Sequence, residues 1–299
     1  MTRVDTTHMS TTQRSDLVLP DIVAEEVIKG FSGKSSLVGS GAIVVSPTLA
    51  VGAGQVNNTI TVPYVEDGGE AQVLTEATAG SLDRLVMSSE TATVVRLFKG
   101  FAFSHLAEMA KTYGMDINEI AAQQLQLAFV RALETLAVQR AVARAATASM
   151  EYDGTAANIS TDAIVETLKL FGEELDDSQL AVWSVNPKPY WDAARISDST
   201  GRTLYTDVAG GRLTQLGGAP VRMTAKSDLV VAGSPTTYKS LLAKRGSILA
   251  WVNPAVKVDY ERDPTADVNM VIGNMYAVVH AYGTMPGGTK PGVAVLKTR

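Results

Sequence analysis

The sequence predicts an α+β fold in which a long helix separates a strand-rich first part from a second part of alternating helices and strands. Three observations support this prediction: a helical run from Asp116 to about Ser149, a polar two-stranded excursion before it, and the alternating patterns after it. The 299 residues suffice for one large or two modest domains. With 45% hydrophobic and 19% charged residues, the composition is typical of a folded protein with a substantial core.

Composition also excludes several classes of site. The chain has no cysteine, which excludes disulfides, thiol nucleophiles and cysteine-based metal sites. No segment approaches the roughly 20 apolar residues of a membrane span, and the Thr/Ser-rich segment 1–20 lacks the apolar run of a signal peptide. The net charge of −5 gives no basic face for gripping nucleic acid, so we expect any association with DNA to be containment without sequence-specific binding.

The first elements are an arm and a ribbon. Residues 1–45 are expected to form a polar N-terminal arm with a short helix over Pro20–Gly30, followed by a connector that enters a short strand. Apolar residues alternate over Thr59–Val65, which predicts a strand, and Pro63 restricts that strand to an edge. Strand character resumes over Leu85–Phe103 after a polar stretch. The pair forms a long ribbon with little core of its own, and the chain offers no obvious surface to support it.

The helical run that follows contains no glycine or proline and is rich in strong helix formers, with Asp116 and Glu119 as a capping box. At 1.5 Å per residue it is roughly 50 Å long. One apolar stripe is expected through Ile117, Ala121, Leu125, Ala128, Ala132 and Leu136. Further apolar residues point elsewhere around the axis, so we expect this spine helix to be covered on more than one side.

The second half begins with a turn at Tyr152-Asp153-Gly154. Helices are then expected over Thr161–Leu175, Pro189–Ile196 and Thr236–Lys244. Strands are expected over Leu180–Val185, Ala219–Met223, Leu229–Ala232 and Val293–Lys297, with a long hairpin formed by Ala255–Asp263 and Asn269–Tyr282.

No motif for catalysis, cofactor or metal emerges. The segment Gly30–Ser35 resembles a phosphate loop, but Ile28 stands where that loop needs its first glycine. The three histidines, His8, His105 and His280, lie far apart in sequence and are expected to be structural. Acidic residues of segment 173–177 are expected to be solvated at a helix end. We therefore expect no catalytic residue, no cofactor and no metal site.

The order of these pieces resembles the HK97-like major capsid proteins of tailed bacteriophages. Four local stretches carry the resemblance: Trp183–Pro187 as a strand ending in Asn-Pro, Ser197–Arg202 as a "D-x-x-G-r" turn, Leu216–Val221 as an "l-x-G-x-P-V" step, and Glu66–Arg96 in the place of an extended loop. The resemblance implies a structural, non-enzymatic protein that self-assembles into hexamers and pentamers of an icosahedral shell around phage DNA. Its implied partners are further copies, a portal, and scaffolding or decoration proteins, and its location is the virion capsid, assembled in the host cytoplasm.

The resemblance also implies a division of the chain. Residues 1–45 form the arm and 59–97 the extended loop. Residues 46–58 and 98–160 form a peripheral domain with the spine helix at about 116–149. Residues 161–254 form the axial domain, 255–285 a hairpin of the peripheral domain, and 286–299 a strand returning to the axial domain.

Two departures from the family pattern matter. No lysine lies between Gln55 and Phe98, so we expect no covalent cross-link from the extended loop. Only about 16 residues precede the part expected to be ordered, so a scaffolding segment is expected to be separate, absent or already removed. An encapsulin-type nanocompartment with the same fold is the alternative, and an α/β enzyme without a recognisable motif is the alternative of another class.

Charge suggests how copies would meet. The acidic residues of the loop are expected either to be solvated or to contact basic side chains of a neighbouring subunit. The candidate intersubunit contacts are Glu66, Asp67, Glu70, Glu76, Arg84, Arg131, Arg140 and Arg144.

Overall fold

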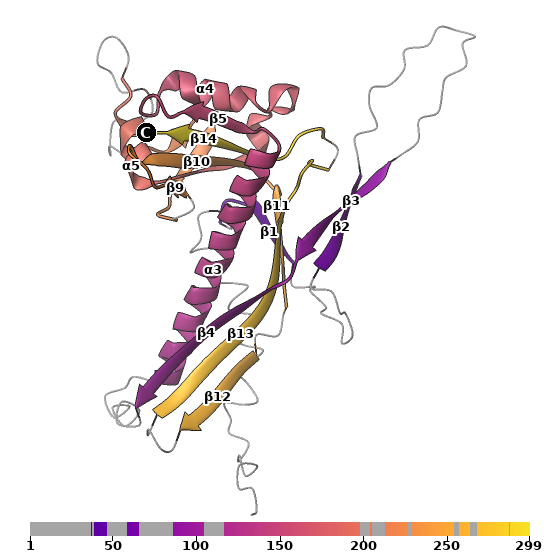
Figure 1. Ribbon diagram of the computed structural model, residues 1–299, viewed down its shortest axis with the longest axis vertical. Helices are drawn as coiled ribbons and strands as arrows, with labels where there is room; N and C mark the ends of the chain where they lie inside the picture. The colour runs from indigo at the N-terminus through magenta and orange to yellow at the C-terminus, as the bar shows by residue number, and fades with distance from the viewer. Residues whose placement is uncertain are drawn as a thin grey trace, which may run out of the picture.

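The computed structural model shows a mixed α+β protein, which confirms the predicted fold class. Two larger sheets are joined by one long helix, and a two-stranded ribbon leaves the body to one side (Figure 1). The expected helix Pro20–Gly30 lies outside the described residues. The structure describes residues 37, 39–46, 59–65, 86–104, 117–197, 204, 213–226, 229–253, 257–263, 268–286 and 288–299.

The long helix, α3 (Ile117–Thr147), is the element that the sequence predicts most directly. It runs from the upper sheet down along the lower one and packs against strands of both (Figure 1). Its buried face differs from the predicted stripe, because Ala128, Ala132 and Leu136 are only half-buried. Among the side chains of α3 that the structure describes, the buried ones are Ala121, Leu125, Phe129, Val130, Leu133, Glu134, Ala137, Val138, Ala141, Val142 and Ala145.

The lower sheet has five strands built around the long strand β13 (Val268–Ala281). One edge of β13 pairs first with β12 (Lys257–Asp263) and then with β11 (Ile248–Val252), which also pairs with β1 (Ile43–Ser46). The other edge pairs with β4 (Val95–Ser104), but only as far as Ala277. The predicted hairpin of β12 and β13 is therefore confirmed.

The upper sheet has seven strands in the order β5-β14-β10-β6-β8-β7, with β9 also on β10. Two helices flank these strands: α4, which Ser160 caps, and α5, which Asn186 caps. The bounds are β5 Glu151–Gly154, α4 Thr161–Lys169, β6 Leu180–Val185, α5 Pro187–Ala194, β7 Gln215–Leu216, β8 Ala219–Met223, β9 Val230–Val231, β10 Thr237–Lys244 and β14 Val293–Thr298, with 3-10 turns η3 Gly172–Glu174 and η4 Asp177–Gln179.

Three local predictions are wrong in this sheet. The helix expected over Thr236–Lys244 is the strand β10, which is held between β14 and β6 despite its helix-forming residues. The turn expected at Tyr152-Asp153-Gly154 belongs to β5, which pairs with β14. The helix expected to reach Leu175 ends earlier, because the chain passes into η3 at Gly172, whose φ is +59°.

The ribbon consists of β2 (Thr59–Val65) and β3 (Met87–Thr93). The strand expected over Leu85–Phe103 is broken at Val94, where the chain leaves the ribbon and enters the lower sheet as β4. Val62 and Ala92 are buried against Val278 of β13. The expectation that the chain offers no supporting surface is therefore wrong for this end of the ribbon, which we call the root.

Candidate functional site

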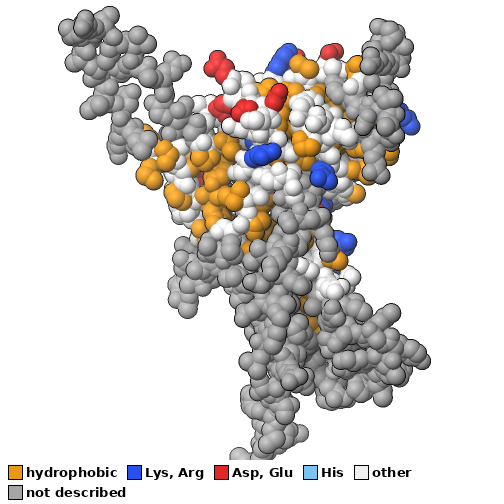
Figure 2. Space-filling view, turned by 180° about the vertical axis from the view of Figure 1, so that it is seen from behind, with side chains coloured by type: hydrophobic (Ala, Val, Ile, Leu, Met, Phe, Trp, Pro, Cys, Tyr) orange, Lys and Arg blue, Asp and Glu red, His pale blue; other side chains and the backbone are white. Residues whose placement is uncertain are grey.

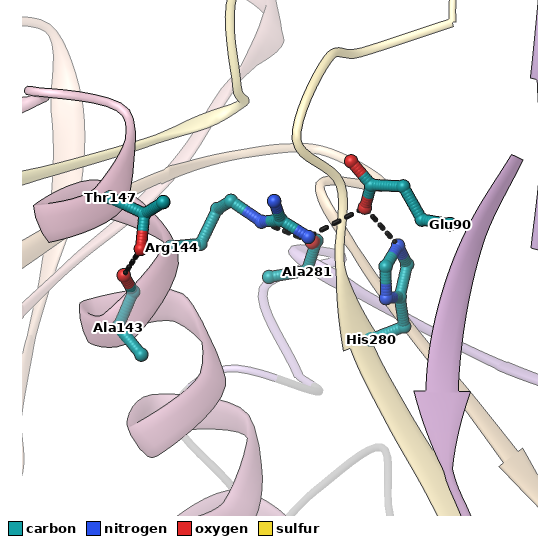
Figure 3. A network of polar contacts seen from close by, with 6 residues as sticks. All are labelled: Glu90, Ala143, Arg144, Thr147, His280 and Ala281. Carbon is teal, nitrogen blue, oxygen red and sulfur yellow. Dashed lines mark hydrogen bonds and ion pairs between the residues drawn. The ribbon is translucent and has the colours of Figure 1, made fainter. Parts of the chain in front are cut away.

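Three charged or titratable side chains meet where the root of the ribbon touches the body (Figure 3). The Oε2 atom of Glu90, on β3, lies 2.5 Å from Nη2 of Arg144, on α3. The same oxygen lies 3.0 Å from Nε2 of His280, on β13. Arg144 Nε also donates a hydrogen bond of 3.0 Å to the backbone oxygen of Ala281. We call Glu90, Arg144 and His280 the junction, because they join the ribbon, the long helix and the lower sheet.

The course of β4 explains why the junction forms here. Since β4 pairs with β13 only as far as Ala277, the backbone edge beyond that residue carries no strand within the described part of the chain. Unpaired backbone acceptors need a partner when they are buried. Arg144, in the last turn of α3, supplies one to Ala281, and the adjacent β3 brings Glu90 over the same edge.

Burial shapes the electrostatics of the junction. His280 is 5% exposed, and its ring packs edge-on to that of Tyr282 at 5.7 Å between centroids. Burial lowers the pKa of His280, Glu90 acts to raise it, and the charges of Arg144 and Arg140 lower it further, so that the pKa lies below its ordinary value. With its pKa lowered, His280 is neutral at neutral pH, and its Nε2 atom lies close to the Glu90 carboxylate without hydrogen-bond geometry.

A polar pocket opens beside the junction between α3 and β3. Its lining includes Thr91, Thr93 and Thr147 together with Arg140, Arg144 and His280. Arg140 is exposed and has no polar partner within the described part of the chain. The pocket therefore offers one uncommitted guanidinium to a negatively charged group from outside.

The structure separates the predicted contact residues into three groups. Arg144 is engaged by Glu90 of its own chain, whereas Arg131 and Arg140 are exposed on α3. The acidic candidates Glu66, Asp67, Glu70 and Glu76, with Arg84, lie outside the described residues. Neither Glu90 nor His280 was singled out from the sequence as a site residue, because a lone histidine and a carboxylate 190 positions apart give no spacing signal.

A second feature is the open face of the lower sheet. Side chains on β4 and β13 alternate, and those on the face away from α3 include Arg96, Phe98, Asn274 and Tyr276. Phe98 is 61% exposed, Arg96 Cζ lies 5.8 Å from its ring centroid, and the Arg96 guanidinium donates two hydrogen bonds to Asn274 Oδ1. An exposed aromatic ring beside an oriented arginine is typical of the centre of a protein interface.

Exposed apolar side chains occur elsewhere as well. At the outer end of the ribbon Val65 pairs with Met87, and both are exposed together with Val86. Figure 2 shows that hydrophobic side chains gather over one broad area of the body when it is seen from behind. Such areas mark surfaces that associate with other molecules.

Within the described ranges no three metal-ligating side chains come together, and no helix is long and apolar enough to cross a membrane. The acidic segment after α4 is partly structural, since Glu174 accepts hydrogen bonds from the backbone nitrogen and the hydroxyl of Thr289. The prediction of a solvated acidic end is therefore wrong for Glu174.

Solved phage structures share this architecture. A chain from Microbacterium phage Oxtober96 matches with a TM-score of 0.65 over 89% of this chain and 91% of its own, at 13% identity. The capsid of Ralstonia phage GP4 matches with a TM-score of 0.59 over 87% of both chains, at 10% identity. The capsid of an empty GTA particle matches with a TM-score of 0.60 over 88% and 90%, at 14% identity. This chain has the phage capsid fold.

The likeness is carried by structure. No protein-family model matches the sequence, and no curated protein matches it either. The predicted resemblance to HK97-like capsid proteins is therefore confirmed at the level of the fold, across nearly the whole chain. Because one fold can serve several functions, the function itself needs a separate argument.

Proposed function

We propose that the chain is the major capsid protein of a tailed bacteriophage, whose copies assemble as hexamers and pentamers into an icosahedral shell around double-stranded DNA. The observation that carries this proposal is the fold shared with phage capsids over about nine tenths of both chains. The protein acts as a structural element of the virion without an enzymatic role. It is assembled in the host cytoplasm, and its further partners are a portal and scaffolding or decoration proteins.

In this proposal the upper sheet is the axial domain at the centre of each capsomer, and it takes the expected residues 161–254 except for β11, which belongs to the lower sheet. The lower sheet and the spine helix α3 form the peripheral domain, and residues 59–97 form the extended loop that reaches a neighbouring subunit. The exposed apolar end of the ribbon supports this assignment, because Val65, Val86 and Met87 are exposed there.

The assembly test is direct. The purified chain should elute from a size-exclusion column as large particles, and electron microscopy should show closed shells. Phe98→Ala should reduce shell formation several-fold with little change in thermal unfolding, because the exposed ring contributes to an interface and little to the core. Phe98→Tyr, which keeps the ring, should still assemble. A stable monomer or dimer that never forms particles would contradict the proposal.

The content of the particles separates this proposal from an encapsulin-type compartment. A phage shell encloses DNA, whereas a nanocompartment encloses a protein cargo. The gene of a phage shell protein also lies beside genes for a portal and a terminase. The solved structures that support the phage assignment are named as phage or GTA capsids. Purified native particles that hold an enzyme and no DNA would favour the alternative.

We further propose that the acidic residues of the extended loop meet exposed arginines of a neighbouring α3. Arg140 is the strongest basic candidate, because its exposed guanidinium makes no hydrogen bond or ion pair with the described residues, while Arg144 is held by Glu90. Exposed ion pairs contribute only about 0.2–1 kcal/mol each, but a closed shell repeats them many times.

This contact has a charge-reversal test. Arg140→Glu and Glu70→Lys should each weaken assembly at low salt, and the two together should restore part of it. The matched control is Arg195→Glu, a reversal on the loop after α5. If Glu70→Lys leaves low-salt assembly unchanged, the proposed pairing is wrong.

A further inference from the structure

The polar pocket beside the junction carries positive charge that its own walls do not balance. Its volume is about 270 Å³, and Arg140 and Arg144 of α3 both line it. Glu90 is not among its lining residues, and none of the described residues that line it is acidic. We propose that this pocket binds a small oxyanion of the chemical class of inorganic phosphate or sulfate, with Arg140 as its main contact.

The two arginines differ in how far they are already engaged. Arg144 is fixed, because its Nη2 atom pairs with Glu90 and its Nε atom donates to Ala281 (Figure 3). Arg140 lies one helical turn earlier, is exposed, and makes no hydrogen bond or ion pair with the described residues. Like charges at this spacing repel each other. Glu90 offsets the charge of Arg144, so the charge of Arg140 is the one that a bound anion would neutralise.

A strand edge forms another wall of the pocket. Directly after β13, the backbone nitrogen of Tyr282 donates to Ser247 on the β11 side. Because backbone groups alternate along a strand, those of Ala281 and Val279 point to the opposite edge, where Arg144 meets the Ala281 oxygen. Val279 lines the pocket, and no strand within the described part of the chain pairs with this edge. Backbone N–H groups at the edge of a sheet are known to form concavities that bind anions.

The other donors and the size of the pocket favour a small oxyanion. Thr91 and Thr93 line the pocket from β3, and a hydroxyl group can donate a hydrogen bond to an anion. A guanidinium presents a fork of N–H donors that matches two oxygens of one anion. The volume of about 270 Å³ lies below the roughly 300–1,000 Å³ of pockets that hold drug-sized ligands. Phosphate or sulfate, with several acceptor oxygens on one centre, therefore suits the pocket better than chloride or a whole nucleotide.

The site belongs to a single chain. In an assembled shell the acidic loop of a neighbour would approach the same arginine, so the oxyanion is expected on unassembled chains and would be displaced on assembly. Phosphate binding by the single chain does not require the shell, and the shell does not require phosphate. Either proposal can therefore fail without the other.

The experiment asks whether phosphate shields Arg140 from a reagent that is specific for arginine. Unassembled full-length chains from a size-exclusion column are treated with phenylglyoxal in an amine buffer whose only anion is chloride. Peptide mass spectrometry gives the modification at Arg140 and at Arg131, which is also exposed on α3 but does not line the pocket. We expect sodium phosphate to slow the modification of Arg140 several-fold and to leave Arg131 unchanged. Sodium chloride at equal ionic strength should protect neither.

Calorimetric titration with sodium phosphate gives an independent measure. Arg140→Gln keeps a polar side chain without the charge, and it should weaken phosphate binding roughly tenfold or more, because a charged hydrogen-bond donor is lost. Arg131→Gln is the matched control on the same helix and should bind phosphate as the parent chain does. Circular dichroism checks that both variants are folded.

Three outcomes would overturn the site. The first is equal protection of Arg131 and Arg140 by phosphate, and the second is the absence of saturable phosphate binding to the parent chain. The third is protection of Arg140 by a short DNA duplex but not by phosphate, because the anion would then belong to a nucleic acid.

Discussion

At the scale of single residues, Glu174 shows how a side chain near a helix end can hold a distant loop. Its carboxylate accepts two hydrogen bonds from Thr289 and lies 3.9 Å from Nζ of the buried Lys244. Lys244 in turn donates to the backbone oxygen of Glu174 and packs on the Phe171 ring. The segment that follows η3 and the loop before β14 are thus joined through one carboxylate.

This carboxylate makes stability depend on pH. Burial acts to raise the pKa of Glu174, but the hydrogen bonds from Thr289 and the charge of Lys244 outweigh it and hold the pKa below its ordinary value. The group therefore contributes stability above its ordinary pKa, and that contribution is lost as the pH falls through the lowered value. Glu174→Gln should lower the free energy of unfolding by about 1–3 kcal/mol at neutral pH and flatten its acid dependence.

Chemical denaturation across a pH series measures both effects. The adjacent Glu173→Gln is a matched control, because Glu173 is exposed and its substitution should change stability by no more than about 0.5 kcal/mol. Equal losses in the two variants would show that Glu174 has no special contact.

Residues of this kind show the limit of sequence at the smallest scale. The acidic segment 173–177 and the lone His280 are visible in the sequence, where the first is interpreted as a solvated helix end and the second as a structural histidine. Their partners are Thr289 and Glu90, more than 100 positions away. The course of the backbone decides which charged side chains come into contact, and the composition does not indicate these pairs.

At the scale of elements, the packing of α3 on β13 depends on one glycine. A Cβ atom at Gly273 would lie 3.0 Å from the ring of Phe129 and 3.3 Å from a methyl of Leu125, closer than side chains normally pack. Both of those side chains are fully buried. The missing side chain on the strand therefore lets an aromatic ring of the helix lie against the sheet.

Gly273→Ala should consequently destabilise the protein by about 1–3 kcal/mol through overpacking. Phe129→Leu makes room at the same point. The double variant should therefore lose less free energy of unfolding than the sum of the losses of the two single variants. Thermal or chemical unfolding of the four chains gives the coupling energy. Gly100→Ala is the control, since its Cβ would find only ordinary contacts at 3.6 Å and beyond. Additive losses would mean that the two positions do not oppose each other.

An element can be predicted from the sequence when its own residues favour its structure, and is missed when contacts with other elements impose it. The helix α3 carries its own signal, a long run of helix formers, and the sequence predicts its ends within about two residues. The strand β10 carries leucine, alanine and lysine, and it is extended because β14 and β6 pair with it on both sides. The buried stripe of α3 was misplaced for a related reason, since the sheets select which apolar residues become core.

At the scale of the whole molecule, the order of elements was enough to predict the capsid fold, although the three solved structures named above are only 10–14% identical to this chain. The same order cannot reveal interfaces, because an exposed residue such as Phe98 satisfies every local rule for a surface position. Contacts between copies depend on symmetry, which a single chain does not encode residue by residue.

The proposed shell should be held without covalent bonds from the extended loop, because segment 55–98 contains no lysine. Particles heated in denaturing detergent should therefore give a single band at the chain mass of 31.6 kDa. Gel electrophoresis with mass spectrometry of the band makes the measurement. A ladder of multiples that resists heating and reducing agent would contradict this expectation.

The position of β14 has a consequence for how the chain is made. Residues 293–298 lie inside the upper sheet between β5 and β10, and five of them are fully buried. A ribosome releases them long after their neighbours, so the sheet stays incomplete until they emerge. A nascent chain interrupted before that point lacks an interior strand and exposes its core to proteases and chaperones.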